Sequence, residues 1–278
     1  MGGMKMTTNA STSNVLEKTL SVREPIIEVR NLDQRFKTTS GNTVVALDNV
    51  NVSIGDTEFL AVLGPSGCGK STLMQIMAGL VKPTSGQVQL KGKDVKGPNR
   101  DIGIVFQRPA LFPWRLVLDN VMLSAEVLGL ERSQAKVRAQ ELLELVGLGD
   151  SGKLYPYELS GGMQQRVSIA RALMHDPEIL FMDEPFGALD ALTRETMGLE
   201  LLRIWDMKRK TVVFITHSVT EALFLADRVL VMSPRPGRVA EDFKVNLPRP
   251  RDLDVMSTPG FSEAAGHLRH LLGATIGE

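Results

Sequence analysis

The stretch GPSGCGKST, at residues 64–72, restricts the fold of this chain more than any other feature. It directly follows the apolar run at residues 59–63 and precedes a helical pattern of apolar residues. A glycine-rich loop between a buried strand and a helix can bind phosphate, because its backbone N–H groups and the positive end of the helix point to one place. The sequence therefore predicts an α/β domain that binds a nucleotide.

The residue types within this loop fit the chemistry of a nucleoside triphosphate. The glycines at positions 64, 67 and 69 have no Cβ, so they allow positive φ and a close approach of the backbone to phosphate. Lys70 can reach the β- and γ-phosphates, and Ser71 can ligate the Mg²⁺ that bridges them. We expect the Lys70 side chain to lie in a solvent-filled site when no nucleotide is bound. The loop residues expected to contact the nucleotide are Gly64, Pro65, Ser66, Gly67, Cys68, Gly69, Lys70, Ser71 and Thr72.

The composition argues against several other classes of protein. The 278 residues carry 32 Lys and Arg against 32 Asp and Glu, so no excess of positive charge favours a nucleic-acid partner. The one cysteine, Cys68, cannot form an internal disulfide, which fits a reducing cytosol. No stretch approaches the roughly 18 consecutive apolar residues that span a bilayer. Any association with a membrane is therefore expected to be peripheral.

Apolar patterns along the chain predict a mostly parallel sheet covered on both faces. Residues 1–25 are poor in apolar side chains and are expected to form a disordered leader, with structure beginning near Ile26. Strands that alternate with helices favour a parallel, doubly covered sheet. The strands are predicted near residues 27–29, 50–54, 59–63, 88–90, 102–106, 179–182, 212–215 and 229–232.

The helical patterns divide the α/β core. A helix after the phosphate loop is expected to end near Gly79, with Leu80 on its apolar face. Residues 108–159 contain no strand pattern, and an amphipathic helix capped by Ser133 and including Val137 is predicted there. We interpret this segment as an inserted helical subdomain. The α/β core is then expected at residues 26–107 and 160–250, with a helix at residues 164–174 and a tail, possible as a short closing helix, at residues 251–278.

Acidic and imidazole groups follow two of the predicted strands. Asp183 and Glu184 end one apolar strand, at the sheet edge where α/β proteins bind ligands, so Asp183 can hold Mg²⁺ and Glu184 can activate water. The alternative is that the two carboxylates only solvate the end of a strand. His217 follows another strand and can contact a γ-phosphate. A single histidine is also often a structural or surface residue.

A second segment, LSGGMQQR at residues 159–166, places a serine and two glycines before a helix. Ser160, Gly161 and Gly162 therefore form a second anion site that has no lysine. One complete and one partial phosphate site in a single chain suggest that two subunits meet across a dimer. The alternative is an ordinary Gly-Gly helix start.

Taken together, these motifs resemble those of the ATPase subunits of ABC transporters, over residues 26 to about 250. The ordered set comprises the phosphate loop, Gln107 after a strand, LSGGMQQR, ILFMDE at 179–184, Ala188-Leu189-Asp190 and His217. The resemblance implies that Lys70, Ser71 and Asp183 bind MgATP and that Glu184 is the catalytic base. It implies that His217 contacts the γ-phosphate. ATP and Mg²⁺ are thus the expected ligands.

Further roles follow from the same resemblance. Gln107 is expected to link the Mg²⁺ site to the helical subdomain. Ser160, Gly161 and Gly162 are expected to complete the ATP site of a second ATPase subunit, which is an identical copy or a close paralogue, and Asp190 to cross the dimer seam. Phe36 stands where the family places an adenine-stacking aromatic, although a core role for Phe36 is the alternative.

The resemblance also suggests partners and a class of transport. The segments at residues 111–115 and 232–239 resemble the importer branch that serves nitrate, sulfonates, taurine and related small solutes. Such a subunit lies at the cytoplasmic face of the inner membrane, where it drives two permease subunits that receive solute from an extracytoplasmic binding protein. Phe112 and Trp114 are expected near the permease, or alternatively in the core of the subdomain. The transported solute cannot be identified from these residues.

Three other functions remain open at this stage. An exporter subunit would carry the same ATPase motifs. A non-transport ATPase of this fold would act in DNA maintenance or on ribosomes. DNA-maintenance relatives carry long coiled coils, but the positions between Lys70 and Ser160 show no sustained heptads. Ribosome-acting relatives generally carry two ATPase halves in one chain, whereas this sequence shows one set of motifs. A nucleotide-binding module without turnover is disfavoured because Glu184 and His217 are both present.

Overall fold

A six-stranded sheet carries the loops of interest in this computed structural model, which describes residues 25–39, 41–187 and 189–276. The strand order is β10-β9-β3-β8-β7-β6, and all neighbours are parallel except β10 and β9. In chain order the strands are β3 (Phe59–Leu63), β6 (Ile102–Val105), β7 (Ile179–Asp183), β8 (Thr211–Thr216), β9 (Arg228–Met232) and β10 (Val239–Lys244). The predicted mostly parallel α/β core is confirmed.

Both faces of this sheet are buried, and they face different hydrophobic clusters. In β3, Leu60 and Val62 contribute to one cluster, whereas Phe59, Ala61 and Leu63 contribute to the other. The same two-residue alternation holds along β7 and β8, because successive side chains of a strand point to opposite faces. This double burial explains why these strands are continuous apolar runs in the sequence.

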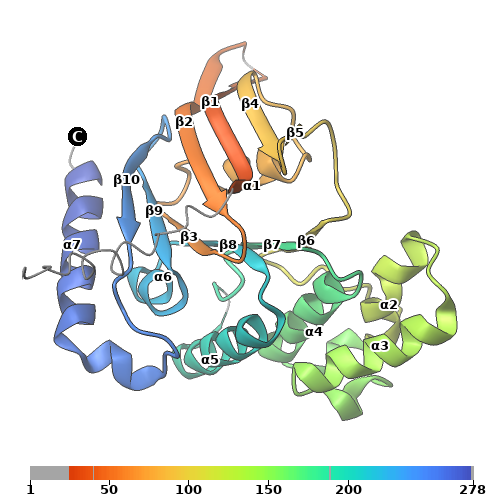
Figure 1. Cartoon of the computed structure of the whole chain (residues 1–278). Helices are drawn as coiled ribbons and strands as arrows, with labels where there is room; N and C mark the ends of the chain where they lie inside the picture. Colours follow the sequence, from red (N-terminus) through yellow and green to blue (C-terminus); the bar gives the residue numbers. More distant parts are fainter. Residues whose placement is uncertain (1–24, 40, 188, 277–278) are drawn as a thin grey trace, which may run out of the picture.

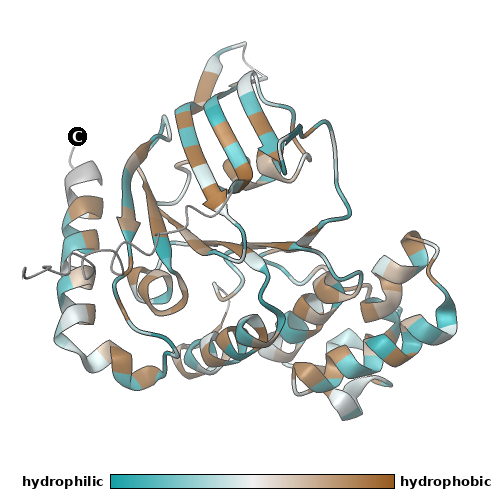
Figure 2. Cartoon of the chain, viewed as in Figure 1, coloured by the Kyte–Doolittle hydropathy of each residue, from teal (hydrophilic) through white to brown (hydrophobic). Residues whose placement is uncertain are grey.

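A second, antiparallel sheet covers one face of the first, together with the helix α1 (Lys70–Met77) (Figure 1). Its strand order is β2-β1-β4-β5. In Figure 2 its strands alternate between hydrophobic and hydrophilic residues, as expected for a sheet with one buried face. The strands are β1 (Pro25–Lys37), β2 (Thr43–Gly55), β4 (Ser85–Leu90) and β5 (Lys93–Asp94).

Helices cover the opposite face of the six-stranded sheet and extend beyond its β6 edge (Figure 1). Between β6 and β7 the chain forms a helical group that projects away from the two sheets, and the limits of this insert, residues 108–159, stay a prediction. Between β6 and β7 lie α2 (Val117–Val127), α3 (Arg132–Leu145) and the 3₁₀ turns Gly149–Ser151 and Pro156–Glu158. The helix α4 (Gly161–Leu173) follows and leads back to β7. The remaining helices are α5 (Ala191–Lys208), α6 (Val219–Leu225), the 3₁₀ turn Leu253–Ser257 and α7 (Pro259–Ile276).

Several details of the helix predictions are wrong. Helix α1 ends at Met77, close to the predicted end near Gly79, which adopts φ 73°, but Leu80 lies beyond the helix and is 45% exposed, so it is not part of an apolar helix face. The N-cap of α3 is Glu131 and not Ser133, since the Glu131 carboxylate accepts hydrogen bonds from two backbone N–H groups of the first turn. Val137 lies on the exposed face of α3.

The two ends of the chain differ in what the structure describes. The predicted leader, residues 1–25, lies outside the described residues except for Pro25, where β1 begins. The tail contains a helix, as the sequence allows, but α7 is 18 residues long and its Leu268 is fully buried. Within the described ranges, the model has no helix that is both long enough and apolar enough to cross a membrane.

Candidate active site

The parallel register of three strands brings the predicted catalytic groups to one edge of the sheet. Leu63 pairs with Thr216 and Asp183 pairs with Ile215, so the last residues of β3, β8 and β7 lie at the same level. The phosphate loop, His217 and Glu184 follow these strands directly. The sequence prediction that these residues share one edge is therefore confirmed.

The phosphate loop needs its glycines for two different reasons. Gly67 and Gly69 adopt φ of 78° and 106°, a region that other residues avoid. Gly64 has ordinary dihedral angles but no room, since a Cβ there would lie 2.9 Å from the Cys68 Sγ and 3.0 Å from the carbonyl oxygen of Met232. Gly69 is also the N-cap of α1, so the loop leads directly into that helix.

The surroundings of Lys70 differ from the expected solvent-filled site. The Lys70 side chain is only 4% exposed, and its ammonium donates hydrogen bonds to the carbonyl oxygens of Gly64 (2.8 Å) and Pro65 (3.0 Å). A carboxylate oxygen of Glu184 lies 3.7 Å from the same ammonium. Buried cations need such partners, so the phosphate loop itself supplies them in this structure. A bound triphosphate would have to replace part of this set.

Ser71 and Asp183 form the only part of the predicted Mg²⁺ site that is in direct contact. The Ser71 hydroxyl donates a 2.9 Å hydrogen bond to the Asp183 carboxylate. Burial raises the pKa of Asp183, while the Ser71 hydrogen bond partly offsets this effect. Within the described residues, no cluster of three or more His, Cys, Asp or Glu side chains is placed to hold a metal ion. These two oxygen ligands fit Mg²⁺, which is commonly held by one or two protein groups plus substrate phosphates.

Glu184 and His217 are paired with each other. A carboxylate oxygen of Glu184 lies 3.3 Å from His217 Nδ1, and the imidazole is about half exposed, at 53%. Glu184 has φ 43°, in the left-handed region, and its backbone N–H donates to the Ile215 carbonyl of β8. The backbone thus directs the carboxylate toward both Lys70 and His217. This arrangement can position a water molecule and shuttle a proton at a phosphate held by the loop.

Gln107 follows β6 at the same sheet edge, but it is not part of the hydrogen-bonded pair of Ser71 and Asp183. Its amide nitrogen is 3.5 Å from the point where a Cβ on Gly187 would lie. No hydrogen bond joins it to Ser71 or Asp183 among the contacts described for these residues. The geometry therefore leaves its predicted role as an Mg²⁺ ligand without direct support.

Two arginines that the sequence reasoning missed hold the site loops. Arg171 of α4 donates to the carbonyl oxygens of Pro109 (2.6 Å) and Ala110 (2.8 Å), and burial lowers the pKa of its guanidinium. It fixes the segment that follows Gln107. Arg235, between β9 and β10, donates to the Gly67 carbonyl oxygen of the phosphate loop at 3.3 Å. Neither contact has a local sequence signal, because each joins segments more than 60 positions apart.

The start of α4 has the geometry of a capped helix, and the predicted second anion site there stays a prediction. Ser160 is the N-cap, and its hydroxyl accepts a hydrogen bond from the Met163 N–H at 3.3 Å. A Cβ on Gly162 would lie 2.9 Å from the Thr193 side chain of α5. Asp190, the N-cap of α5, accepts hydrogen bonds from the backbone N–H and the hydroxyl of Thr193, which lower its pKa. Ser160, Gly162 and Asp190 are therefore neighbours, whereas Ala188 of the same motif lies outside the described residues.

Phe36 and Cys68 differ in how accessible their side chains are to a ligand: Phe36 is exposed and Cys68 is buried. Phe36 is 42% exposed near the end of β1, which rules out the core alternative for its ring. Cys68 is 1% exposed, and burial raises the pKa of its thiol. The thiol of Cys68 is therefore not accessible in this loop conformation, and its backbone N–H donates to the Pro65 carbonyl oxygen at 3.4 Å.

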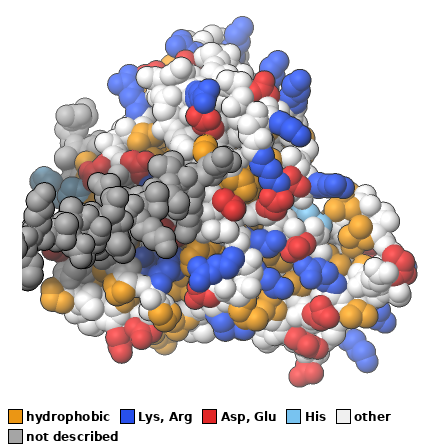
Figure 3. Space-filling model, viewed as in Figure 1, with side chains coloured by type: hydrophobic (Ala, Val, Ile, Leu, Met, Phe, Trp, Pro, Cys, Tyr) orange, Lys and Arg blue, Asp and Glu red, His pale blue; other side chains and the backbone are white. Residues whose placement is uncertain are grey.

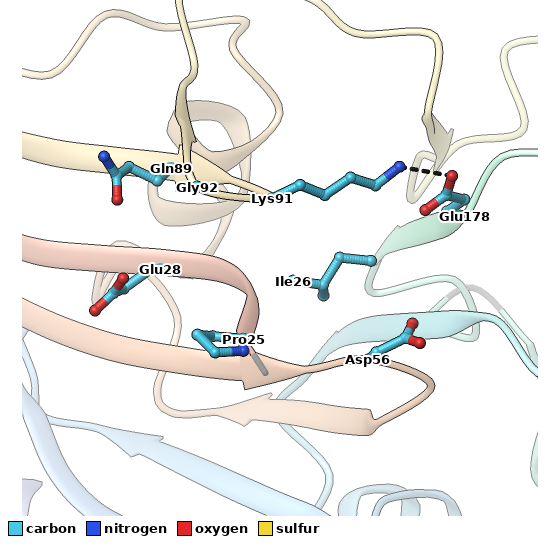
Figure 4. Close-up of a pocket in the computed structure, with 8 residues that line it drawn as sticks. All are labelled: Pro25, Ile26, Glu28, Asp56, Gln89, Lys91, Gly92 and Glu178. Atoms are coloured by element: carbon cyan, nitrogen blue, oxygen red, sulfur yellow. Dashed lines mark ion pairs between the residues drawn. The ribbon is translucent and has the colours of Figure 1, made fainter. Parts of the chain in front are cut away.

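One pocket on the described part of the surface lies away from the predicted site. A pocket of about 620 Å³ is lined by Lys91 and Glu178, which form an ion pair, and by residues near the start of β1 (Figure 4). Glu178 immediately precedes β7, so this pocket lies at the amino edge of the sheet, opposite the phosphate loop. Ligands of α/β sheets bind at the carboxyl edge. Figure 3 shows Lys and Arg side chains interspersed with Asp and Glu on the face viewed, without a dominant basic area.

A comparison with known protein families identifies the family of this chain. A family profile described as "ABC transporter" matches residues 47–187, from within β2 to the loop after Glu184. The chain belongs to the ABC transporter family. ABC ATPase subunits bind and hydrolyse ATP, with Mg²⁺ as the usual partner ion, so this chain is an ATPase subunit and ATP is its substrate.

Named relatives cover most of the chain. An ABC transporter ATP-binding protein of Methanocaldococcus jannaschii is 54% identical over 81% of this chain and 84% of its own length. The taurine import ATP-binding protein TauB of Rhizobium johnstonii is 49% identical over 86% of this chain and 94% of its own length. Pelagibacter ubique has a protein of the same name that is 49% identical over 79% of this chain and 82% of its own length.

Solved structures agree with the ABC ATPase fold. A dimeric ATP-binding cassette, MJ0796, in a post-hydrolysis state with ADP and Pi has a TM-score of 0.71 and 33% identity, covering 80% of this chain and all of that one. The protein cbiO1 of Clostridium perfringens, described as part of the ABC transporter complex cbiONQ, has a TM-score of 0.73 and 26% identity. It covers 91% of this chain and 99% of its own.

The contacts of Lys70 predict the effect of removing its charge. A hydrogen bond to a charged group contributes about 1.5–3 kcal/mol, so Lys70→Ala should weaken ATP binding by roughly tenfold or more and lower turnover. Because Lys70 also binds two loop carbonyls, the thermal unfolding midpoint must be measured beside nucleotide affinity. Lys82→Ala, which removes an exposed lysine five residues after α1, is the matched control. Unchanged affinity in a folded Lys70→Ala protein would refute the assignment.

Proposed function

We propose that this ATPase energises the import of a small sulfonate such as taurine, or of a related small anion such as nitrate, through separate permease subunits. The observation that carries the proposal is the 49% identity to a taurine import ATP-binding protein over 86% of the chain. The segments at residues 111–115 and 232–239 support the same branch of importers. The subunit would work at the cytoplasmic face of the inner membrane as a peripheral protein, with an extracytoplasmic binding protein supplying the solute.

Within the site, the contacts described above support a role for each residue. Lys70 would neutralise the β- and γ-phosphates, and Ser71 and Asp183 would hold Mg²⁺, which supplies charge neutralisation at the transferred phosphoryl group. Glu184 would accept a proton from the attacking water. His217, at 3.3 Å from Glu184, would contact the γ-phosphate. Gln107 would then act through the segment that Arg171 holds and would reach Mg²⁺ only after a movement of that segment.

The second half of each ATP site would come from another ATPase subunit. Ser160 and Gly161 are exposed at the start of α4, next to the exposed Asp190. An exposed N-cap serine with free space around Gly161 offers anion-binding groups to a partner. This favours a head-to-tail dimer, formed with an identical copy or a close paralogue, in which ATP lies between Lys70 of one subunit and Ser160 of the other.

The permease would dock beside the segment that follows Gln107. Trp114 is 71% exposed, and its ring lies 5.1 Å from that of the half-buried Phe112. Asn120, which is fully buried, accepts from the Phe112 N–H and donates to the Phe112 carbonyl, so the segment is held in place although Trp114 is exposed. A large apolar side chain that is fixed and exposed is typical of an interface.

Growth of a deletion strain tests the transported solute. A strain without this subunit should lose growth on taurine or an alkanesulfonate as sole sulfur source, and should grow normally on sulfate. Nitrate as sole nitrogen source is the parallel arm. The gene for the wild-type chain should restore growth, and a Glu184→Gln version should not. Normal growth of the deletion strain on taurine, on an alkanesulfonate and on nitrate would refute the proposed substrate class.

Replacing Trp114 tests the docking surface. Trp114→Ala should lower solute uptake several-fold while the ATPase rate and the unfolding midpoint of the isolated subunit stay unchanged, because the side chain is exposed. Met207→Ala, which removes a 60% exposed apolar side chain on α5, is the control. A marked fall in the unfolding midpoint would instead favour a core role for the ring.

Shared ATP sites predict a nucleotide-dependent dimer. Glu184→Gln keeps the size of the side chain but cannot accept a proton, so turnover should fall by about 10²-fold or more and bound ATP should persist. This variant should sediment as a dimer with ATP, and the wild type with ADP should be mainly monomeric. Adding Ser160→Arg should abolish the dimer, whereas adding Ser133→Arg, at an exposed serine of α3, should not. Persistence of the dimer with Ser160→Arg would contradict the shared site.

A further inference from the structure

A continuous polar path joins the loop that carries Asp190 to the loop that carries His217. Arg194 of α5 donates to the carbonyl oxygen of Leu189 at 3.1 Å and lies 3.3 Å from a carboxylate oxygen of Glu221 on α6. The other oxygen of Glu221 accepts a 2.5 Å hydrogen bond from the Thr216 hydroxyl. The same hydroxyl accepts from the Ser218 N–H at 2.9 Å.

The two ends of this path have a specific position. It begins at Leu189, one residue before the seam residue Asp190, and it ends on Thr216 and Ser218, the residues on both sides of His217. Each end of the path is therefore one residue away from a group with a proposed role in catalysis or in dimer closure. The path itself touches neither the phosphate loop nor Glu184 through a hydrogen bond.

The charged pair at the centre of the path is shielded from water. The Glu221 side chain is 13% exposed and the Arg194 side chain is 34% exposed. Burial raises the pKa of Glu221, and the Thr216 hydrogen bond and the charge of Arg194 oppose that rise. Partly buried charges of this kind interact more strongly than surface pairs, because solvent and salt screen them less.

Helices α5 and α6 pack closely where Gly198 meets Phe224, but space remains beside the Arg194–Glu221 pair. A cavity of about 210 Å³ lies beside the pair, lined by Arg194 and Glu221 together with apolar side chains such as Phe186 and Phe224. The Nε–H of Arg194 is buried and makes no hydrogen bond within the described residues, although Glu221 is near. A small relative movement of the two helices can complete this bond, so the pair is able to respond to a shift of the Asp190 loop.

We propose that Arg194 and Glu221 are positioning residues that transmit closure of the dimer seam to His217. The inference rests on the proposed roles of Asp190 and His217. When a second subunit moves the loop at Leu189 and Asp190, Arg194 moves with the Leu189 carbonyl and carries Glu221 with it. Glu221 in turn sets Thr216 and Ser218, and so the direction of the His217 imidazole toward the γ-phosphate.

The variants Glu221→Gln, which keeps the side-chain length, and Arg194→Gln, which shortens the side chain, each remove one charge of the pair. In each, the turnover number for ATP should fall about tenfold, with KM for ATP within about twofold of wild type, because the phosphate loop is untouched. The double variant should be no slower than the slower single variant, since both break one link. Arg194→Lys, which keeps the charge, should recover part of the turnover. Asp206→Asn removes the carboxylate of an exposed ion pair on the same helix and should have wild-type kinetics.

Two further measurements separate transmission from folding and from dimer formation. Thr216→Val replaces a buried hydroxyl by a methyl group of similar shape and should lower turnover in the same way, which keeps the proposal testable if the charge variants unfold. In a Glu184→Gln background, Glu221→Gln should still give the ATP-dependent dimer with an affinity within about threefold. Loss of the dimer, or additive effects in the double variant, would overturn the proposal.

His217→Ala distinguishes failure of this inference from failure of the proposed function. If His217→Ala keeps wild-type turnover, the proposed role of His217 is wrong and the path has no catalytic end. If His217→Ala is inactive while Glu221→Gln and Thr216→Val keep wild-type turnover, the site roles stand and the transmission path alone is refuted.

Discussion

The register of three parallel strands is the constraint on which the rest of the site depends. Because β3, β8 and β7 end at one level, the loop that binds phosphate, the acidic pair and the histidine meet without any long insertion. Burial on both faces fixes that register, since a slip of one residue would exchange the side chains of the two hydrophobic clusters. The chemistry at the edge is thus stabilised by apolar packing several residues away.

The polar and charged side chains at this edge contact one another within one subunit. Lys70 is held by loop carbonyls near Glu184, Ser71 by Asp183, and His217 by Glu184. An incoming triphosphate competes with these internal contacts, and it gains affinity only to the extent that its own contacts are stronger. The exposed groups at Ser160 and Asp190 lie on other elements, so one chain carries two different half-sites.

The positions of the buried strands and the edge that carries the site were predictable because local patterns encode them, whereas the strand order was not predicted. Continuous apolar runs mark β3, β7, β8 and β9, and the polar residues after them mark the edge. The strand β10 was missed because its residues alternate between half-buried and exposed positions, and α5 because its apolar face is interrupted by charged residues. Lys70 was expected in solvent because sequence cannot show that the loop folds its carbonyls back onto the ammonium. Arg171 and Arg235 act over long separations and leave no local pattern.

The left-handed backbone of Glu184 has a consequence for how this protein can evolve. A residue other than glycine in that region carries a conformational cost of roughly 1–2 kcal/mol. Here the cost falls on Glu184, the residue after Asp183, whose backbone N–H also contacts β8. Glycine or asparagine would relieve it, so selection for stability alone would drift away from glutamate at this position. A Glu184→Gly or Glu184→Asn substitution would therefore relax the backbone but lose the carboxylate that faces Lys70 and His217.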